Sequence, residues 1–190
     1  NYTYGFYHEC AKKFPRHGVH LYKYIQKAFD MMPVAALIES KIFCMHGGLS
    51  PELNCQPDDW DVIRAIQRPV SVPGEGLLCD LLWADPSPDV SDFQFNTVRR
   101  VSYFFGEEMV RQFCEEKDID LIVRGHEVVE PGYVFFAEQR LVTLFSATNY
   151  CGHFNNCGGV MNISEDLLIS FYQIHPRPQQ LSSDEGDSNQ

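Results

Sequence analysis

Residues 41–50 read KIFCMHGGLS. A short apolar run, typical of a buried strand, ends directly in His46 and two glycines. Residues 119–127, IDLIVRGHE, repeat the design, with His126 placed just after a second apolar run and a glycine. Glycine beside a strand end lets backbone and ligands come close, and neutral imidazole is the commonest nitrogen ligand of transition metals. His46 and His126 are therefore candidate metal ligands, and a hydrogen-bonded strand end is the alternative for each.

The sequence around these two stretches favours helices first and strands last. Apolar residues recur every three to four positions from Tyr4 to Phe14 and from Leu21 to Met32, which predicts two helices, the second ended by Pro33. Val34–Ile38 and Lys41–Met45 predict a hairpin. Further helices are predicted over 57–66, 77–83 and 107–117, and strands over 119–123, 133–137, 141–145, 158–163 and 167–174. This order predicts an α+β fold built in layers.

Length and charge exclude several classes of protein. The 190 residues suit about one domain, and 15 basic against 26 acidic residues give a formal net charge of −11. That charge argues against a nucleic-acid binder, which needs a basic face, and no apolar run is long enough for a membrane span. Seven cysteines without a repeated spacing favour reduced thiols in an intracellular compartment. We expect residues 1–175 to form the domain and the polar residues 176–190 to form a disordered tail.

Two other places carry candidate site residues. Arg99 and Arg100 stand together, and a guanidinium can hold phosphate through two hydrogen bonds, although a solvated pair is the alternative. The loop Ser146–Asn156, SATNYCGHFNN, places Tyr150 among asparagines and glycine, where an aromatic side chain often faces a ligand; a plain turn is the alternative. The residues alone thus indicate a metal–histidine site with an arginine, acting on phosphate.

Five stretches together resemble one known family. They are YGFYHEC (4–10), KIFCMHGGLSPEL (41–53), GLLCDLLWADP (76–86), RGHEVVEPGY (124–133) and LVTLFSATNYCGHFNN (141–156). They resemble the phosphoprotein phosphatase family of serine/threonine phosphatases, most closely its type-1 catalytic subunit, from Tyr4 to about Pro176. The resemblance implies a layered metallophosphatase β-sandwich flanked by helices, with its N-terminal part missing and two divalent ions, Mn²⁺ or Fe/Zn, at one edge.

The resemblance also implies roles for single residues. His46 and His126 would bind one of the metal ions, Arg99 would clamp the phosphate, and Tyr150 would overhang the active site. Trp83 and Asp85 match positions that line the cleft, without a defined role. The implied reaction is hydrolysis of phosphoserine and phosphothreonine esters by a hydroxide that two metal ions activate, with arginines neutralising the phosphate oxygens and a histidine protonating the leaving group.

Part of the family's machinery is not in this sequence. The family motifs GDxHG, GDxxDRG and GNHE, which supply the remaining metal ligands, a second arginine and the proton donor, do not occur. We therefore expect the chain to be the C-terminal part of a phosphatase and to be inactive alone. Two alternatives stay open: a non-catalytic decoy that binds regulatory-subunit peptides, and a hydrolase acting on a small phosphate ester such as a dinucleotide.

The resemblance further implies a groove for partners. Type-1 phosphatases capture Val-x-Phe or Val-x-Trp peptides of regulatory subunits, and the matching positions are Ile42, Leu121, Phe135 and Phe171. Apolar strand residues more often belong to a core, which is the alternative. The expected partners are phosphoprotein substrates and regulatory subunits, without nucleic acid or membrane, and the expected location is the cytoplasm or nucleus.

Overall fold

The computed structural model describes residues 1–53 and 60–177. The chain divides into a first unit, residues 1–126 and 135–142, and a second unit, residues 127–134 and 143–190. The predicted helix start at 57–59 and all but the first two residues of the predicted tail lie outside the described residues. Within the described part, no helix combines the length and apolarity that crossing a bilayer requires.

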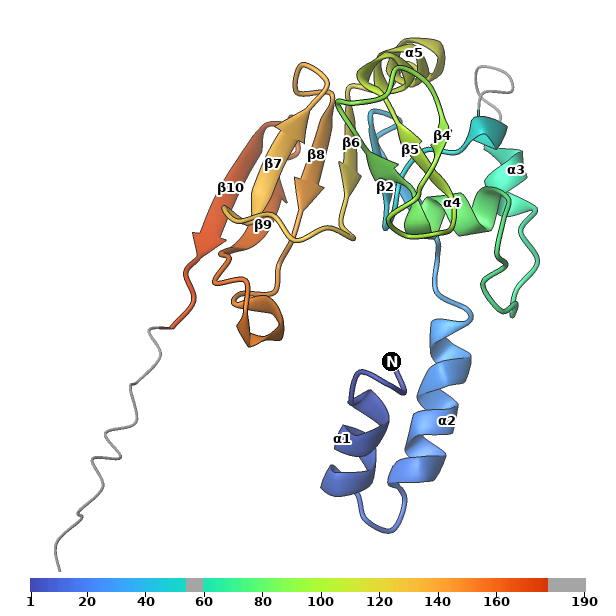
Figure 1. Ribbon diagram of the computed structural model, residues 1–190, viewed down its shortest axis with the longest axis vertical. Coiled ribbons are helices and arrows are strands. Elements are labelled where there is room, and N and C mark those ends of the chain that lie inside the picture. The colour runs from blue at the N-terminus through green and yellow to red at the C-terminus, as the bar shows by residue number, and fades with distance from the viewer. Residues whose placement is uncertain (54–59, 178–190) are drawn as a thin grey trace, which may run out of the picture. The chain divides into compact units, whose positions relative to one another are not determined.

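The first unit begins with two helices, as predicted, α1 (Phe6–Lys13) and α2 (Gly18–Phe29), which pack side by side (Figure 1). The prediction that Pro33 ends the second helix is wrong, because α2 already ends at Phe29. The hairpin prediction is also confirmed, because β1 (Ala35–Ile38) pairs antiparallel with β2 (Ile42–Met45). Residues 39 and 40 turn the chain with φ of 47° and 55°, the left-handed pair typical of a tight hairpin turn.

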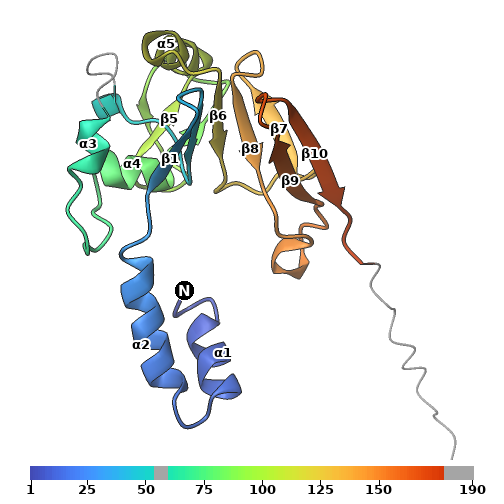
Figure 2. The same ribbon diagram turned by 180° about the vertical axis from the view of Figure 1, so that it is seen from behind.

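Strand β2 is the centre from which the main sheet is built. It pairs in parallel with β6 (Leu121–Arg124), with Ile42 opposite Leu121. The sheet order is β1-β2-β6-β8-β7, where β7 is Tyr133–Phe136 and β8 is Leu141–Leu144 (Figure 2). Because neighbouring parallel strands end at the same edge of a sheet, the residues that follow β2 and β6 meet there.

Four further helical segments belong to the first unit. They are a 3-10 turn (Pro51–Leu53), α3 (Asp61–Arg64), α4 (Leu77–Trp83) and α5 (Glu107–Lys117). The last two have the predicted bounds. A three-stranded sheet, β3 (Asp85–Pro86), β5 (Tyr103–Phe105) and β4 (Gln94–Phe95), was not predicted. Its strands are two or three residues long, too short to show an alternating pattern in the sequence.

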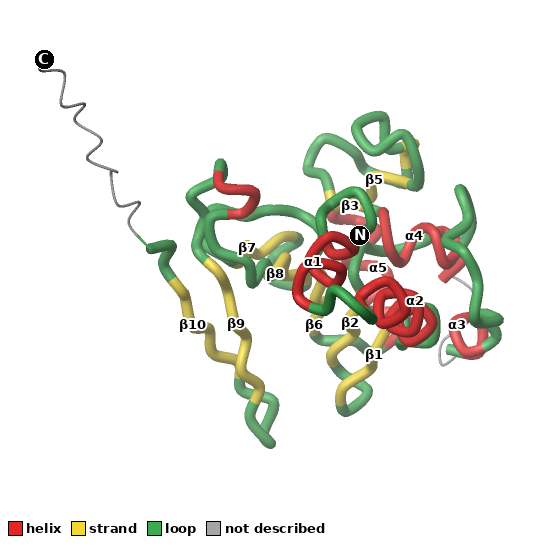
Figure 3. The backbone as a smooth tube through the Cα atoms, turned by 90° about the horizontal axis from the view of Figure 1, so that it is seen from below, coloured by secondary structure: helices red, strands yellow, loops and turns green. Residues whose placement is uncertain are grey.

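The second unit contains the hairpin of β9 (Gly158–Ile163) and β10 (Ile169–Ile174), two adjacent strands in Figure 3. Its register pairs Gly158 with Ile174. A 3-10 turn, Tyr150–Gly152, lies in the loop before β9. All the strands predicted for the last third of the chain are therefore present, each shifted by at most two residues at either end.

The core of the first unit is aromatic. The ring of Phe43 on β2 stacks on Phe113 of α5 at 5.5 Å and lies 4.8 Å from the ring of Trp60. Phe43, Phe105 and Phe113 are at most 1% exposed. Aromatic residues bury more apolar area per residue than most other side chains, so these contacts supply much of the unit's hydrophobic stabilisation.

A charged residue lies inside this apolar unit. The side chain of Arg124, at the end of β6, is 0% exposed. Its Nη2 lies 2.8 Å from Asp85 Oδ1, and the guanidinium also donates hydrogen bonds to the carbonyl oxygens of Gly47 and Ala84 at 2.6 and 3.2 Å. Through these contacts Arg124 links the residues that follow β2 and α4 to the end of β6. Burying an unpaired charge is costly, so this arrangement is stable only while the carboxylate of Asp85 neutralises the guanidinium.

The glycines after β2 are required by close packing. The N–H of Gly47 donates to Leu81 O at 2.7 Å, which brings the turn onto the end of α4. A Cβ at Gly47 would lie 2.4 Å from Trp83 N, and one at Gly48 would lie 2.2 Å from Phe105 Cε1. Neither position has room for a side chain.

We predict that Asp85→Asn destabilises the chain by about 3 kcal/mol at neutral pH, because it leaves buried Arg124 without a counter-charge. Burial alone would raise the pKa of Asp85, but the hydrogen bond from Arg99 and the charge of Arg124 outweigh it, so the pKa lies below its ordinary value. A carboxyl with a lowered pKa stabilises the fold above its unfolded-state pKa and loses this effect as pH falls. The difference in unfolding free energy between the wild type and Asp85→Asn should therefore become smaller as the pH falls. Urea unfolding at several pH values measures it.

The control for this prediction is Glu9→Gln, which removes an exposed ion pair between Lys13 and Glu9. Exposed pairs contribute at most about 1 kcal/mol, so this variant should unfold almost like the wild type. Equal stabilities of Asp85→Asn and Glu9→Gln would show that the buried pair is not a constraint on the fold.

We also predict that Gly47→Ala costs about 1–3 kcal/mol, because the added methyl overlaps the backbone of α4. The matched control is Gly74→Ala, where a Cβ would meet nothing within 4 Å. Its unfolding midpoint in urea should stay close to that of the wild type. A Gly47→Ala protein as stable as the Gly74→Ala protein would contradict the packing described here.

Candidate metal and phosphate site

The two candidate histidines meet at one edge of the main sheet. His46 directly follows β2, His126 comes two residues after β6, and the N–H of Gly125 donates to His46 O at 3.1 Å. His126 Nδ1 lies 3.3 Å from His46 Nε2. The resemblance implies that these two histidines, 80 positions apart in the chain, bind one metal ion. The structure places their rings next to each other. Their role as metal ligands stays a prediction.

The backbone of His126 is strained. Its φ is 68°, in the left-handed region that non-glycine residues seldom adopt. Such a conformation costs free energy and persists only where surrounding contacts enforce it, as they often do at functional sites. Here the hydrogen bond from Gly125 N–H to His46 O holds the peptide between Arg124 and Gly125, one peptide before His126.

Both imidazoles are held in the form that binds metals. Desolvation by surrounding protein atoms lowers the pKa of His46, and the charges of Arg124 and Arg99 lower it further. Burial lowers the pKa of His126 to about 4, with Arg99 and Arg124 acting in the same direction and Asp85 opposing them. At neutral pH both rings are therefore neutral, and a neutral ring has a lone pair available for a cation.

The second nitrogen of His126 faces a carboxylate. His126 Nε2 lies 3.8 Å from Asp85 Oδ1, and it is buried without a hydrogen-bond partner among the described residues. Metal-binding histidines commonly point their other nitrogen toward a carboxylate, which fixes the tautomer. A proton on Nε2 leaves the lone pair on Nδ1, the nitrogen that faces His46.

Asp85 connects the histidines to the candidate phosphate clamp. Its Oδ2 accepts hydrogen bonds from Arg99 Nε and Asn96 Nδ2, each at 2.9 Å. Asn96 Oδ1 in turn accepts from the backbone N–H of Arg99 at 2.9 Å. Both the side chain and the backbone of Arg99 are thus fixed, directly or through Asn96, by one carboxylate.

This anchoring leaves the outer half of Arg99 available. Its side chain is 28% exposed, and its two terminal nitrogens donate no hydrogen bond to the described residues. A guanidinium held at Nε with free terminal N–H groups can take a phosphate oxygen on each. Arg100 is exposed and has φ of 60°; only its backbone N–H contacts this network, donating to Asn96 O at 2.8 Å.

Two neighbouring residues support the site. The ring of Trp83 lies edge-on to that of His126, with centroids 5.3 Å apart. Asp80 is buried and accepts hydrogen bonds from Ser50 at 2.6 Å and Ser102 at 2.7 Å, which joins the turn after β2 to the strand that begins at Tyr103. Burial raises the pKa of Asp80, and these two hydrogen bonds oppose the rise.

The histidine pair fits part of a metal centre. Nitrogens 3.3 Å apart can both reach one cation at the roughly 2.0–2.1 Å of a zinc–nitrogen bond. Within residues 1–53 and 60–177, no group of three or more His, Cys, Asp or Glu residues is arranged to hold a metal ion. The described residues therefore offer two ligands for one ion and do not complete a two-metal centre.

Tyr150 and the four groove residues are divided between the two units. Tyr150 belongs to the second unit, is 43% exposed, and packs its ring edge-on against Phe145 at 5.0 Å. Ile42 and Leu121 are only 2% and 4% exposed, because they pair inside the main sheet. Phe135 is 37% exposed, and Phe171 stacks on Tyr133 within the second unit at 4.0 Å. Ile42 and Leu121 therefore offer almost no exposed surface to a partner.

The sequence analysis missed the residues that hold the site together. Asp85 had no defined role, and neither Asn96 nor Arg124 was singled out. A signal existed for Arg124, since a cation that ends an apolar strand must find a buried counter-charge. The partner could not be identified, because Asp85 lies 39 positions away in the chain.

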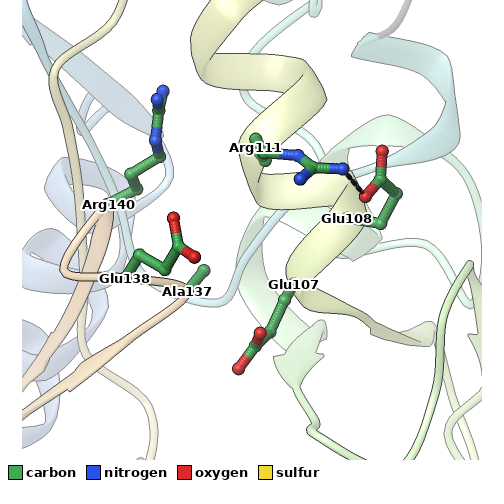
Figure 4. Close-up of a pocket in the computed structure, with 6 residues that line it drawn as sticks. All are labelled: Glu107, Glu108, Arg111, Ala137, Glu138 and Arg140. Atoms are coloured by element: carbon green, nitrogen blue, oxygen red, sulfur yellow. Dashed lines mark hydrogen bonds and ion pairs between the residues drawn. The ribbon is translucent and has the colours of Figure 1, made fainter.

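A separate cavity of about 80 Å³ lies between α5 and the β7–β8 turn (Figure 4). Its lining contains Glu107, Glu138 and Arg140, and Figure 4 shows Arg111 paired with Glu108. The cavity is small and its arginines face carboxylates, Arg140 at 3.8 Å from Glu115. It contains none of the candidate site residues.

Comparisons with known proteins agree with this geometry. Residues 1–130 match the family model described as calcineurin-like phosphoesterase. The structure is also similar to that of a protein serine/threonine phosphatase from Saccharomyces cerevisiae with similarity to human phosphatase PP5, with a TM-score of 0.77 and 25% identity over 92% of this chain and 56% of that chain. This chain thus spans little more than half the length of that phosphatase. The metallophosphatase fold predicted from the sequence is confirmed, and the chain belongs to the calcineurin-like phosphoesterase family.

Proposed function

We propose that this chain is part of a protein serine/threonine phosphatase that hydrolyses phosphoserine and phosphothreonine esters. The observation that carries the proposal is the pair of imidazole nitrogens 3.3 Å apart, joined through Asp85 to the anchored guanidinium of Arg99. The likeness to the yeast phosphatase supports a phosphoprotein substrate. The motifs that resemble the type-1 catalytic subunit are the reason to assign this chain to that branch of the family.

The residues of this chain would act at two places in the reaction. His46 and His126 would hold one of the divalent ions that the family uses, and Asp85 would keep the ring of His126 in the required tautomer. An ion held by these two histidines would supply a Lewis acid and would lower the pKa of a bound water molecule. Arg99 would hold the non-bridging phosphate oxygens through its terminal N–H groups and balance the charge that develops on them.

The chain alone should not be active. Two imidazoles fill only part of one coordination shell, and metal affinity falls steeply when ligands are missing. The remaining ligands and the proton donor would come from residues other than those described. That Tyr150 overhangs the phosphate stays a prediction from the resemblance.

Regulatory partners belong to the same proposal. Phe135 is the most exposed of the three groove positions in the first unit and so the best placed of these to contact a Val-x-Phe peptide. Ile42 and Leu121 are buried, so they would line the bottom of such a groove only if peptide binding exposed them. Location in the cytoplasm or nucleus remains an expectation from the resemblance.

We predict that two substitutions separate the metal role from the phosphate role. In the longest reading frame that contains this chain, His126→Ala should lower bound manganese and reduce kcat/KM for a phosphoserine peptide by at least about 100-fold, because a metal ligand is lost. Arg99→Ala should keep the metal content and reduce kcat/KM by about 10–100-fold, because a charge-assisted clamp is lost. Metal analysis after dialysis and a phosphate-release assay measure both effects.

The matched control is Arg100→Ala, which removes an exposed side chain but keeps the backbone N–H that donates to Asn96 O, and it should leave metal content and rate unchanged. Equal metal loss in the Arg99 and His126 variants would make Arg99 a structural residue. A folded protein that carries the missing motifs and releases no phosphate with manganese would contradict the phosphatase assignment. Binding of a Val-x-Phe peptide without hydrolysis would favour the decoy alternative, and faster turnover of a dinucleotide than of the peptide would favour a small-substrate hydrolase.

A further inference from the structure

A cysteine and a histidine face each other at the open end of the β9–β10 hairpin. The antiparallel register pairs Gly158 with Ile174, so the next two residues outward, Cys157 and His175, are also opposite each other. Directly opposed residues of an antiparallel pair have their Cβ atoms about 4.5–5.5 Å apart. Cys157 Sγ accordingly lies 3.2 Å from His175 Nδ1.

The backbone holds this pair in place. The N–H of Cys157 donates to Glu130 O at 2.8 Å, and its carbonyl oxygen accepts from Asn156 Nδ2 at 2.9 Å. Gln173, two residues before His175, donates through its side chain to Pro131 O at 2.7 Å. The segment around Glu130 and Pro131 therefore fixes both strands of the hairpin near the thiol and the imidazole.

Both side chains line an open cavity of about 620 Å³ that lies entirely within the second unit. Small-molecule sites typically measure about 300–1,000 Å³. Apart from Gly152 and Pro176, the other lining residues carry polar or charged side chains that offer both donors and acceptors: Glu130, Asn149, His153, Asn155 and Arg177. Cys157 is half-buried and His175 is exposed, so a solute can reach the sulfur.

The remaining described cysteines lack this combination of access and a base. Cys10, Cys79 and Cys114 are buried, and burial raises the pKa of the Cys114 thiol to about 11. Cys44 is half-buried, and burial raises its pKa as well. Cys151 is exposed, but no imidazole lies within hydrogen-bond distance of it among the described residues.

We propose that Cys157 and His175 form a reactive thiol site that exchanges with low-molecular-weight, peptide-like disulfides. His175 Nδ1 takes the thiol proton as Cys157 Sγ attacks one sulfur of the disulfide. A new S–S bond forms to Cys157, the original S–S bond breaks, and its electron pair leaves on the second sulfur. That sulfur then takes the proton from Nδ1 and departs as a thiol. Two electrons pass from Cys157 to the disulfide, and no other oxidant is needed.

This proposal is independent of the phosphatase assignment, since it uses only residues outside the metal and phosphate site. Its site includes Asn149, Gly152, His153 and Asn155 of the loop that carries Tyr150. A mixed disulfide at Cys157 would occupy the cavity beside that loop. The modification is reversible by thiols, because exchange runs in both directions.

The test uses the full 190-residue chain and glutathione disulfide at neutral pH, with the glutathionylated cysteines counted by peptide mass mapping over time. Cys157 should react about three- to tenfold faster than Cys151, because an adjacent base promotes thiolate attack. His175→Gln removes the basic nitrogen and should bring the Cys157 rate to within about twofold of the Cys151 rate. The matched control is His153→Gln, the same change at another histidine that lines the cavity, and it should leave the ratio unchanged.

Circular dichroism checks that both variants are folded, and the Cys151 rate is the internal standard in each. Denatured wild-type chain should lose the preference for Cys157, because the preference depends on the hairpin register. A wild-type Cys157 that reacts no faster than Cys151 would overturn the proposal without any variant. So would a folded His175→Gln chain with the wild-type rate ratio.

Discussion

The buried pair of Arg124 and Asp85 is the interaction on which the rest of the first unit depends. The arginine side chain is 0% exposed and reaches the carbonyl oxygens of Gly47 and Ala84 as well as the carboxylate. It therefore fixes the turn after β2, the end of α4 and the end of β6 relative to one another. The same carboxylate positions Arg99 and faces His126, so the fold and the candidate site share one network of charges. A substitution at Asp85 would therefore affect both the stability of the fold and the geometry of the candidate site.

Much of this arrangement could be predicted from local sequence. Helices α4 and α5 have the predicted bounds because their apolar spacing is regular and turn residues flank them. Local sequence identified both histidines at strand ends beside glycine; that they meet at one ion was implied only by the family resemblance, and the parallel pairing of β2 with β6 explains why their rings lie close together. The glycines after β2 have a packing reason that the sequence could only suggest, since a Cβ at Gly48 would collide with Phe105.

The rest depends on contacts between distant residues. Strands β3, β4 and β5 are too short to leave a pattern, and they place Asp85 and Asn96 beside each other. The facing of Cys157 and His175 follows from the register of β9 and β10, which a one-residue slip would abolish. Burial of Ile42 and Leu121 likewise follows from the sheet order rather than from the residue types. In each case tertiary pairing, which local patterns do not encode, decides the outcome.

The convergence of two imidazoles on one cation can be observed directly by ¹⁵N NMR of the histidine side chains in this chain during a zinc titration. Zinc is diamagnetic and suits neutral imidazole ligands. The geometry described here predicts that His46 Nε2 and His126 Nδ1 shift together, with the same midpoint, while His153 does not follow them. Separate midpoints for the two rings, or a shift of only one, would mean that they do not share an ion and would contradict the account of the site.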